Sequence, residues 1–109
     1  YRLRLDGTDT RVVELPMAPY LNDWALFGNP QQLGAQTDPE AVLRIWKSEL
    51  EGAEKERGVL SLTLHPQVIG RHHRLELLRQ LLREAKTKKA WIARASDVVQ
   101  HVNAGAGGK

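Results

Sequence analysis

His65 is the residue whose type and position offer the clearest route to chemistry. It follows a predicted β-strand at residues 59–64, and Pro66 after it prevents the strand from continuing. Loops that leave the ends of buried strands carry the active sites of many α/β enzymes. An imidazole changes its charge near neutral pH, so His65 can serve as a general acid or base. The alternative is a histidine that is hydrogen-bonded within the fold and takes no part in catalysis.

The other candidate groups indicate no metal, phosphate or nucleophile site. His72 and His73 are neighbours at the start of a predicted helix and point in different directions, so helical spacing cannot direct both at one metal ion. His101 is expected to be exposed. No serine stands in a nucleophile elbow. Gly70 is isolated, and we interpret it as room for a close backbone approach rather than as part of a phosphate-binding loop.

Composition argues against several functional classes. The chain has 109 residues, which suits one domain or part of a larger one, and its net charge of +3 comes from dispersed lysines and arginines. Such a distribution predicts no nucleic-acid partner. No cysteine is present, so disulfides and cysteine-bound metals are excluded. No run approaches the ~18 apolar residues of a membrane helix, and no signal-peptide core is seen, so no membrane partner is expected. The compartment stays open.

Helices are predicted on both sides of the His65 strand. Thr37 and Asp38 are both N-cap residues, Pro39 suits the first turn, and Gly58 supplies the stop. A second helix follows the His65 loop with an apolar stripe of Leu75, Leu78, Leu82 and Ala85, widened by Leu77 and Leu81. Between the helices, the leucines of strand 59–64 fall on the face opposite its small polar residues. This arrangement fits a barrel-like α/β layout, with the leucines under the helices.

Further strands are expected near both ends of the chain. Residues 2–5 alternate apolar and charged side chains, Asp6–Gly7 is a turn signal, and residues 11–15 (RVVEL) follow as a second strand, which predicts a hairpin. Residues 90–94 read as a short strand before a last helix. Strands that alternate with helices predict a parallel sheet. Residues 17–36 form a loop rich in aromatic residues, which either covers a site or covers the core.

The ends of the sequence suggest a fragment or a processed product. The chain begins at Tyr1 rather than at a methionine, and its first strand follows at once. Residues 103–109 are rich in Gly and Ala and are predicted to be a flexible tail. We therefore expect residues 1–102 to be a portion of one domain.

Three stretches resemble the C-terminal part of the polysaccharide deacetylase family, in the branch that includes peptidoglycan-deacetylase-like and allantoinase-like proteins. They are LTLHPQVIGRHHRLELLRQLL, WIARASDVV and VVELPMAPYLNDWALF. The resemblance implies the C-terminal half of a distorted (β/α) barrel, and it covers the chain to about Val102. It also implies hydrolysis of an N-acetyl or related amide bond with a divalent metal, such as zinc, held by one Asp and two His.

The resemblance implies roles for particular residues. His65 corresponds to the general acid that protonates the leaving amine, and Leu62 and Leu64 to the walls of a small pocket for the acyl methyl group. Tyr20 lies in the same segment as Asp23 and Trp24, whose Asp-Trp pair resembles one that lines the substrate groove. The sequence departs from the pattern at Thr63, where the family has leucine.

The metal ligands and the base of the family belong to the N-terminal half of its domain, which this chain does not contain. The expected partners are therefore that half, as another chain or segment, and a carbohydrate or small amide substrate. Alone, the chain should bind no metal and be inactive. A non-catalytic carbohydrate-binding or assembly module of the same fold is the alternative, and a homo-oligomer is compatible with either.

Overall fold

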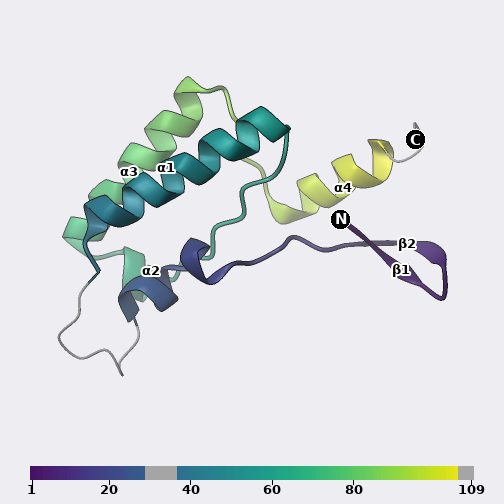
Figure 1. The fold of residues 1–109 in the computed structure, drawn as a ribbon, viewed down its shortest axis with the longest axis horizontal. Helices are drawn as coiled ribbons and strands as arrows, with labels where there is room; N and C mark the ends of the chain where they lie inside the picture. Colours follow the sequence, from purple (N-terminus) through teal and green to yellow (C-terminus); the bar gives the residue numbers. More distant parts are fainter. Residues whose placement is uncertain (29–36, 106–109) are drawn as a thin grey trace. The chain divides into compact units, whose positions relative to one another are not determined.

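The computed structural model describes residues 1–28 and 37–105, in two compact units (Figure 1). One unit joins Tyr1–Pro16 to the chain from Trp91 onward, and the other is Met17–Ala90. A β-hairpin is followed by helices, so the chain is a small mixed α/β protein, as the sequence predicts in general terms. Within the described ranges the one regular sheet is this hairpin. The expected parallel sheet and half-barrel are not present there.

The first unit begins with the predicted hairpin. Strands β1 (Arg2–Leu5) and β2 (Thr8–Val13) pair in antiparallel fashion. Asp6 has φ 50° and Gly7 has φ 80°, so both turn residues adopt the left-handed conformation that two-residue hairpin turns favour. The hairpin is confirmed. Its second strand starts earlier than the predicted 11–15 because so tight a turn brings the chain straight back onto β1.

The same unit ends in helix α4 (Ala95–Gly105). Residues 90–94, predicted as a strand, are irregular instead. Arg94 lies just before the helix, and its Nε is 3.0 Å from Asp97 Oδ2 in the first helical turn. A strand needs a hydrogen-bonded neighbour, and in the described part of the chain residues 90–94 have none.

Helix α4 also extends into the predicted tail. It includes Asn103, whose Nδ2 donates a hydrogen bond of 3.0 Å to the Arg11 carbonyl in β2. Arg2 likewise donates through Nη2 to the Val102 carbonyl. These bonds fasten the end of the helix to the hairpin, so the residues up to Gly105 are helical. Residues 106–109 of the predicted tail lie outside the described residues.

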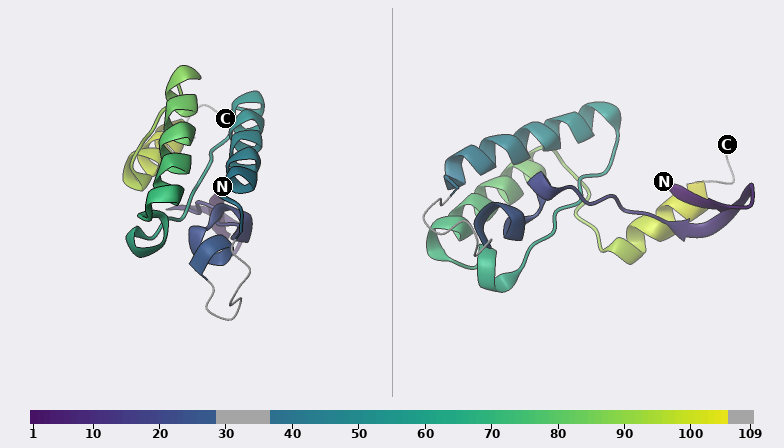
Figure 2. Two further views of the ribbon diagram at one scale, coloured as in Figure 1. Left: turned by 90° about the vertical axis from the view of Figure 1, so that its left-hand side faces the viewer. Right: turned by 60° about the horizontal axis from the view of Figure 1, so that its bottom comes forward.

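The second unit is built around two long helices that lie side by side, α1 (Pro39–Glu56) and α3 (His72–Thr87) (Figure 2). The short helix α2 (Pro66–Ile69) precedes α3, and two single turns, η1 (Pro19–Leu21) and η2 (Trp24–Gly28), precede α1. No helix in the described ranges has the length and apolar character needed to cross a membrane. The helices enclose a core of Leu21, Val42, Trp46, Leu50, Ile69, Leu77, Leu81 and Ala85.

The ends of α1 follow from local capping. Of the two predicted caps, Asp38 is the one used, because its side chain accepts a 3.0 Å hydrogen bond from the Glu40 N–H. The Thr37 hydroxyl donates instead to the Leu26 carbonyl, which ties the start of α1 to η2. At the other end Arg57 takes the left-handed conformation with φ 53° and terminates the helix.

The buried face of α3 is one side of the widened stripe that the sequence predicts. Leu77, Leu81 and Ala85 are buried, whereas Leu82, a member of the predicted stripe, is 42% exposed. Two leucine rows run next to each other along this helix, so spacing alone cannot choose between them. The packing of α1 decides which row is buried.

Residues 59–64 are extended but form no regular strand. Their contact with η1 is a single parallel bridge, in which Thr63 accepts from the Asp23 N–H at 3.1 Å and donates to the Leu21 carbonyl at 2.9 Å. The strand prediction is therefore wrong in extent, because one short neighbour pairs with only one position of the segment. Its side-chain alternation holds, since Leu60, Leu62 and Leu64 pack against the core.

Substitution of Trp46 tests how the core supports this arrangement. The side chain is fully buried, and its Nε1 donates a 2.8 Å hydrogen bond to the Tyr20 carbonyl in η1. Trp46→Ala should lower the free energy of unfolding by about 3–5 kcal/mol, measured by urea denaturation. The neighbouring exposed residue provides the control, since Ile45→Ala should change it by less than about 1 kcal/mol. Equal effects of the two variants would contradict the assigned core.

Candidate functional site

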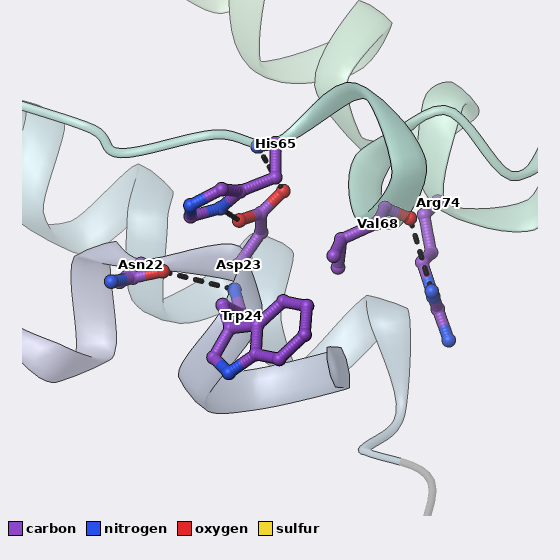
Figure 3. A network of polar contacts seen from close by, with 6 residues as sticks. All are labelled: Asn22, Asp23, Trp24, His65, Val68 and Arg74. Carbon is purple, nitrogen blue, oxygen red and sulfur yellow. Dashed lines mark hydrogen bonds and ion pairs between the residues drawn. The ribbon is translucent and has the colours of Figure 1, made fainter. Parts of the chain in front are cut away.

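A buried carboxyl group meets His65 at the centre of the candidate site (Figure 3). Asp23 is fully buried, and both of its side-chain oxygens contact the same histidine. Oδ2 accepts a 2.8 Å hydrogen bond from the backbone N–H of His65, and Oδ1 lies 2.7 Å from the ring Nδ1. The carboxyl group thus holds both the main chain and the side chain of His65.

Helix α2 determines the backbone conformation of His65. The residue is its N-cap, with extended dihedral angles of φ −119° and ψ 125°, and Pro66 begins the helix. The His65 carbonyl accepts from the N–H groups of Val68 and Ile69, each at 2.9 Å. Gly70 ends the helix where a Cβ atom would collide with the Pro66 carbonyl. The prediction that this glycine allows a close backbone approach is confirmed.

The parallel bridge brings Asp23 to His65 across 42 residues of sequence. Asn22 pairs with Thr63, and the backbone N–H of Asp23, the residue after Asn22, donates a hydrogen bond to the Thr63 carbonyl. The Asn22 side chain accepts a 2.9 Å hydrogen bond from the Trp24 N–H, which starts the η2 turn.

The contact with Asp23 bears on which ring nitrogen of His65 carries a proton. An ionised aspartate only accepts hydrogen bonds, so with Asp23 in that form the 2.7 Å contact places a proton on Nδ1. That leaves Nε2 as the ring nitrogen that can exchange a proton with another molecule. The His65 side chain is 36% exposed, so part of it is accessible to another molecule.

Trp24 supplies an aromatic surface beside this ring. The two rings meet edge to face, with their centroids 6.0 Å apart and their planes at 61°. The Trp24 side chain is 44% exposed although it is large and apolar. An exposed indole next to a histidine offers a ligand a flat apolar face within reach of a proton donor.

The structure brings together three of the predicted site residues: Asp23, Trp24 and His65. The Tyr20 side chain is exposed, while its carbonyl accepts from Trp46. Leu62 and Leu64 pack against the helical core. Side chains alternate along an extended segment, so the Leu64 side chain points away from that of His65.

The described residues do not fit the metal site that the family resemblance implies. Residues 1–28 and 37–105 contain no group of three or more His, Cys, Asp or Glu side chains that could hold a metal ion. Asp23 and Nδ1 of His65 are already engaged with each other.

Near the C-terminus, the ring of His101 packs edge to face against that of Trp91, with the ring centroids 5.4 Å apart.

Two features of the site were not foreseen from the sequence. Asp23 was predicted to line a groove, whereas it is the hydrogen-bonding partner of His65. The second feature is Arg74, which donates to the Val68 carbonyl at 3.0 Å and stands over the Phe27 ring. An aspartate among apolar residues was a signal for the first. Nothing in the spacing indicated the second.

Comparison with known proteins leaves the site to be interpreted from its own geometry. No known family, curated protein or solved structure matches the chain.

The proton assignment at His65 can be measured directly. We expect the neutral ring to carry its proton on Nδ1, observed by long-range proton–nitrogen NMR correlation of ¹⁵N-labelled histidine. In Asp23→Asn the amide NH₂ can donate to Nδ1, so the proton should move to Nε2. His72, exposed at the start of α3, should be unchanged and serves as the internal control. A wild-type ring protonated on Nε2 would contradict the assignment.

Proposed function

We propose that this chain is the C-terminal half of a distorted (β/α) barrel domain that hydrolyses N-acetyl or related amide bonds, with His65 as the general acid. The observation that carries the proposal is the pair of contacts between His65 and the buried Asp23 carboxyl group. A histidine that a carboxylate orients through Nδ1, with Nε2 left to exchange the proton, is the arrangement that proton-transfer enzymes use.

The chemistry requires such a group. Hydrolysis of an amide adds water to the carbonyl carbon and breaks the carbon–nitrogen bond, and the departing nitrogen needs a proton to leave as an amine. His65 in its doubly protonated form donates the Nε2 proton to that nitrogen. The proton on Nδ1 stays hydrogen-bonded to Asp23, which keeps the ring oriented during the transfer.

The base and any metal are assigned to residues outside the described part of this chain. The resemblance to polysaccharide deacetylases implies a divalent metal, such as zinc, held by one Asp and two His of the N-terminal half. The residues described here do not fit such a site, so no step is assigned through the metal. The proposal limits this chain to proton delivery and substrate contact.

Two observations support the barrel. The bridge between Asn22 and Thr63 is parallel, and α1 connects the two segments, as in a β-α-β crossover unit. The next crossover helix, α3, leads to residues 90–94. In the complete domain we infer that residues 59–64 and 90–94 become strands, because neighbouring strands would supply the hydrogen bonds that they lack in the described part of the chain.

The substrate class follows from Trp24. Its exposed indole beside His65 suits the apolar face of a sugar ring, so an N-acetylated carbohydrate is the substrate class that we favour over a small amide. Tyr20, exposed at the neighbouring turn, is the candidate for a second aromatic contact.

Leaving-group dependence tests the role of His65 in the full-length protein. His65→Ala should slow deacetylation of an N-acetylated oligosaccharide by ~10²–10⁴-fold, because an alkylamine cannot leave without a proton. The loss should be much smaller for an acetylated nitroaniline, whose nitrogen needs less protonation. His72→Ala is the control and should retain the wild-type rate. Unchanged turnover by His65→Ala would refute the assignment.

The exposed Trp24 also favours a second function, a carbohydrate-binding module without catalysis. In that case the wild-type protein would bind an oligosaccharide without releasing acetate, and Trp24→Ala would abolish binding while His65→Ala would not. Calorimetric titration together with an acetate assay separates the two functions.

A further inference from the structure

Two segments that are distant in sequence build the candidate site, and Asp23 and His65 fasten them at one point. A second fastening comes from Arg74, in the first turn of α3 (Figure 3). Its Nη1 donates a 3.0 Å hydrogen bond to the carbonyl of Val68, and its guanidinium carbon stands 4.9 Å from the centre of the Phe27 ring. One side chain therefore contacts both segments.

Both residues that Arg74 contacts are connected to the candidate site within a few residues of chain. Val68 lies in α2, and its N–H donates to the His65 carbonyl at 2.9 Å. Phe27 lies in η2, the turn that Trp24 begins. Arg74 is thus connected on one side to the histidine and on the other side to the indole that stands beside it.

The side chains between η2 and α2 are closely packed, with no room for an added methyl group at Gly28. A Cβ atom placed on Gly28 would lie 2.9 Å from Trp24 Cε3 and 3.2 Å from Val68 Cγ2. The Trp24 indole and the Val68 side chain therefore both lie next to Gly28, at the end of η2. A change in the separation of turn and helix must therefore move the indole.

Arginine suits this position for a chemical reason. Its planar guanidinium can donate a hydrogen bond in its plane and present its face to an aromatic ring at the same time. The side chain is half-buried, and Nε has no hydrogen-bond partner in the described ranges. Lysine keeps the charge but lacks the flat group that can do both.

We infer that Arg74 is a positioning residue: by holding η2 against α2, it sets the place of the Trp24 indole beside His65 and with it the affinity for the sugar. This inference rests on the proposed function for its effect on substrate, while the position of the indole can be tested without it. Asp23 keeps its own hold on His65, so proton delivery does not depend on Arg74.

The experiment compares Arg74→Gln and Phe27→Leu in the full-length protein with Arg79→Gln, an exposed arginine of the same helix, as the control. In the two test variants we expect weaker nuclear Overhauser contacts between the Trp24 and His65 rings, with the Nδ1 proton of His65 unchanged. KM for the oligosaccharide should rise by about fivefold while kcat stays within about twofold, because binding in the ground state and the transition state falls equally.

A merely structural role would give a different pattern. It would lower the amount of active protein, so kcat would fall while KM and the ring contacts stayed at wild-type values, and that result would overturn the inference. If Arg74→Gln fails to fold, Phe27→Leu decides, because it removes the ring beneath the guanidinium and leaves the Arg74 hydrogen bond to Val68 in place. It should weaken the same ring contacts, and wild-type contacts would refute the positioning role. If neither the wild-type protein nor any variant hydrolyses the oligosaccharide, while the ring contacts change as expected, the proposed function would be rejected and the positioning role of Arg74 would be kept.

Discussion

The carboxyl group of Asp23 is the group on which the arrangement of the site depends. A carboxyl group in the interior of a protein is costly unless its hydrogen bonds are satisfied. Here both oxygens are satisfied by one residue, His65, through its main chain and its ring. The segments 21–23 and 62–65 must therefore stay together for the unit to keep a satisfied interior. The fold and the candidate chemistry share the same hydrogen bonds.

The helices serve this pair indirectly. Trp46 of α1 fills the centre of the core and also donates to the carbonyl of Tyr20, three residues before Asp23. Helix α3 contributes Leu77 and Leu81 to the same core and sends Arg74 to the opposite side of the site. The same two helices that form the hydrophobic core therefore also donate hydrogen bonds, from Trp46 and Arg74, to the segments that carry Asp23 and His65.

Local signals in the sequence predicted the elements that depend on neighbours in the chain. The Asp6–Gly7 hairpin, the start of α1 at its Asp38 cap and the close approach at Gly70 all follow from the chemistry of a few adjacent residues. The expected strands at 59–64 and 90–94 failed, because a strand needs partners and the periodicity of side chains does not say where they are.

The candidate site divides in the same way. His65 was identified by its type and by Pro66 after it, and Trp24 by its aromatic loop. The pairing of Asp23 with His65 spans 42 residues and depends on a single bridge. No spacing rule predicts such a contact. For α3 the sequence predicted an apolar face that includes both leucine rows, but spacing could not say that Leu77 and Leu81 would be buried and Leu82 exposed.

Under the proposed function, the two contacts that hold His65 have a consequence for which acetyl groups would be removed. Because one carboxyl group binds both the main-chain N–H and the ring, the imidazole has little freedom to rotate, and it loses little conformational entropy when it acts. A side chain that cannot turn delivers its proton along one direction. In the proposed deacetylation of a polymer with several similar acetamido groups, the choice among them would then depend on how the polymer binds beside His65 and Trp24. Substrate binding would then determine the regioselectivity, and His65 would protonate whichever nitrogen the bound polymer places next to it.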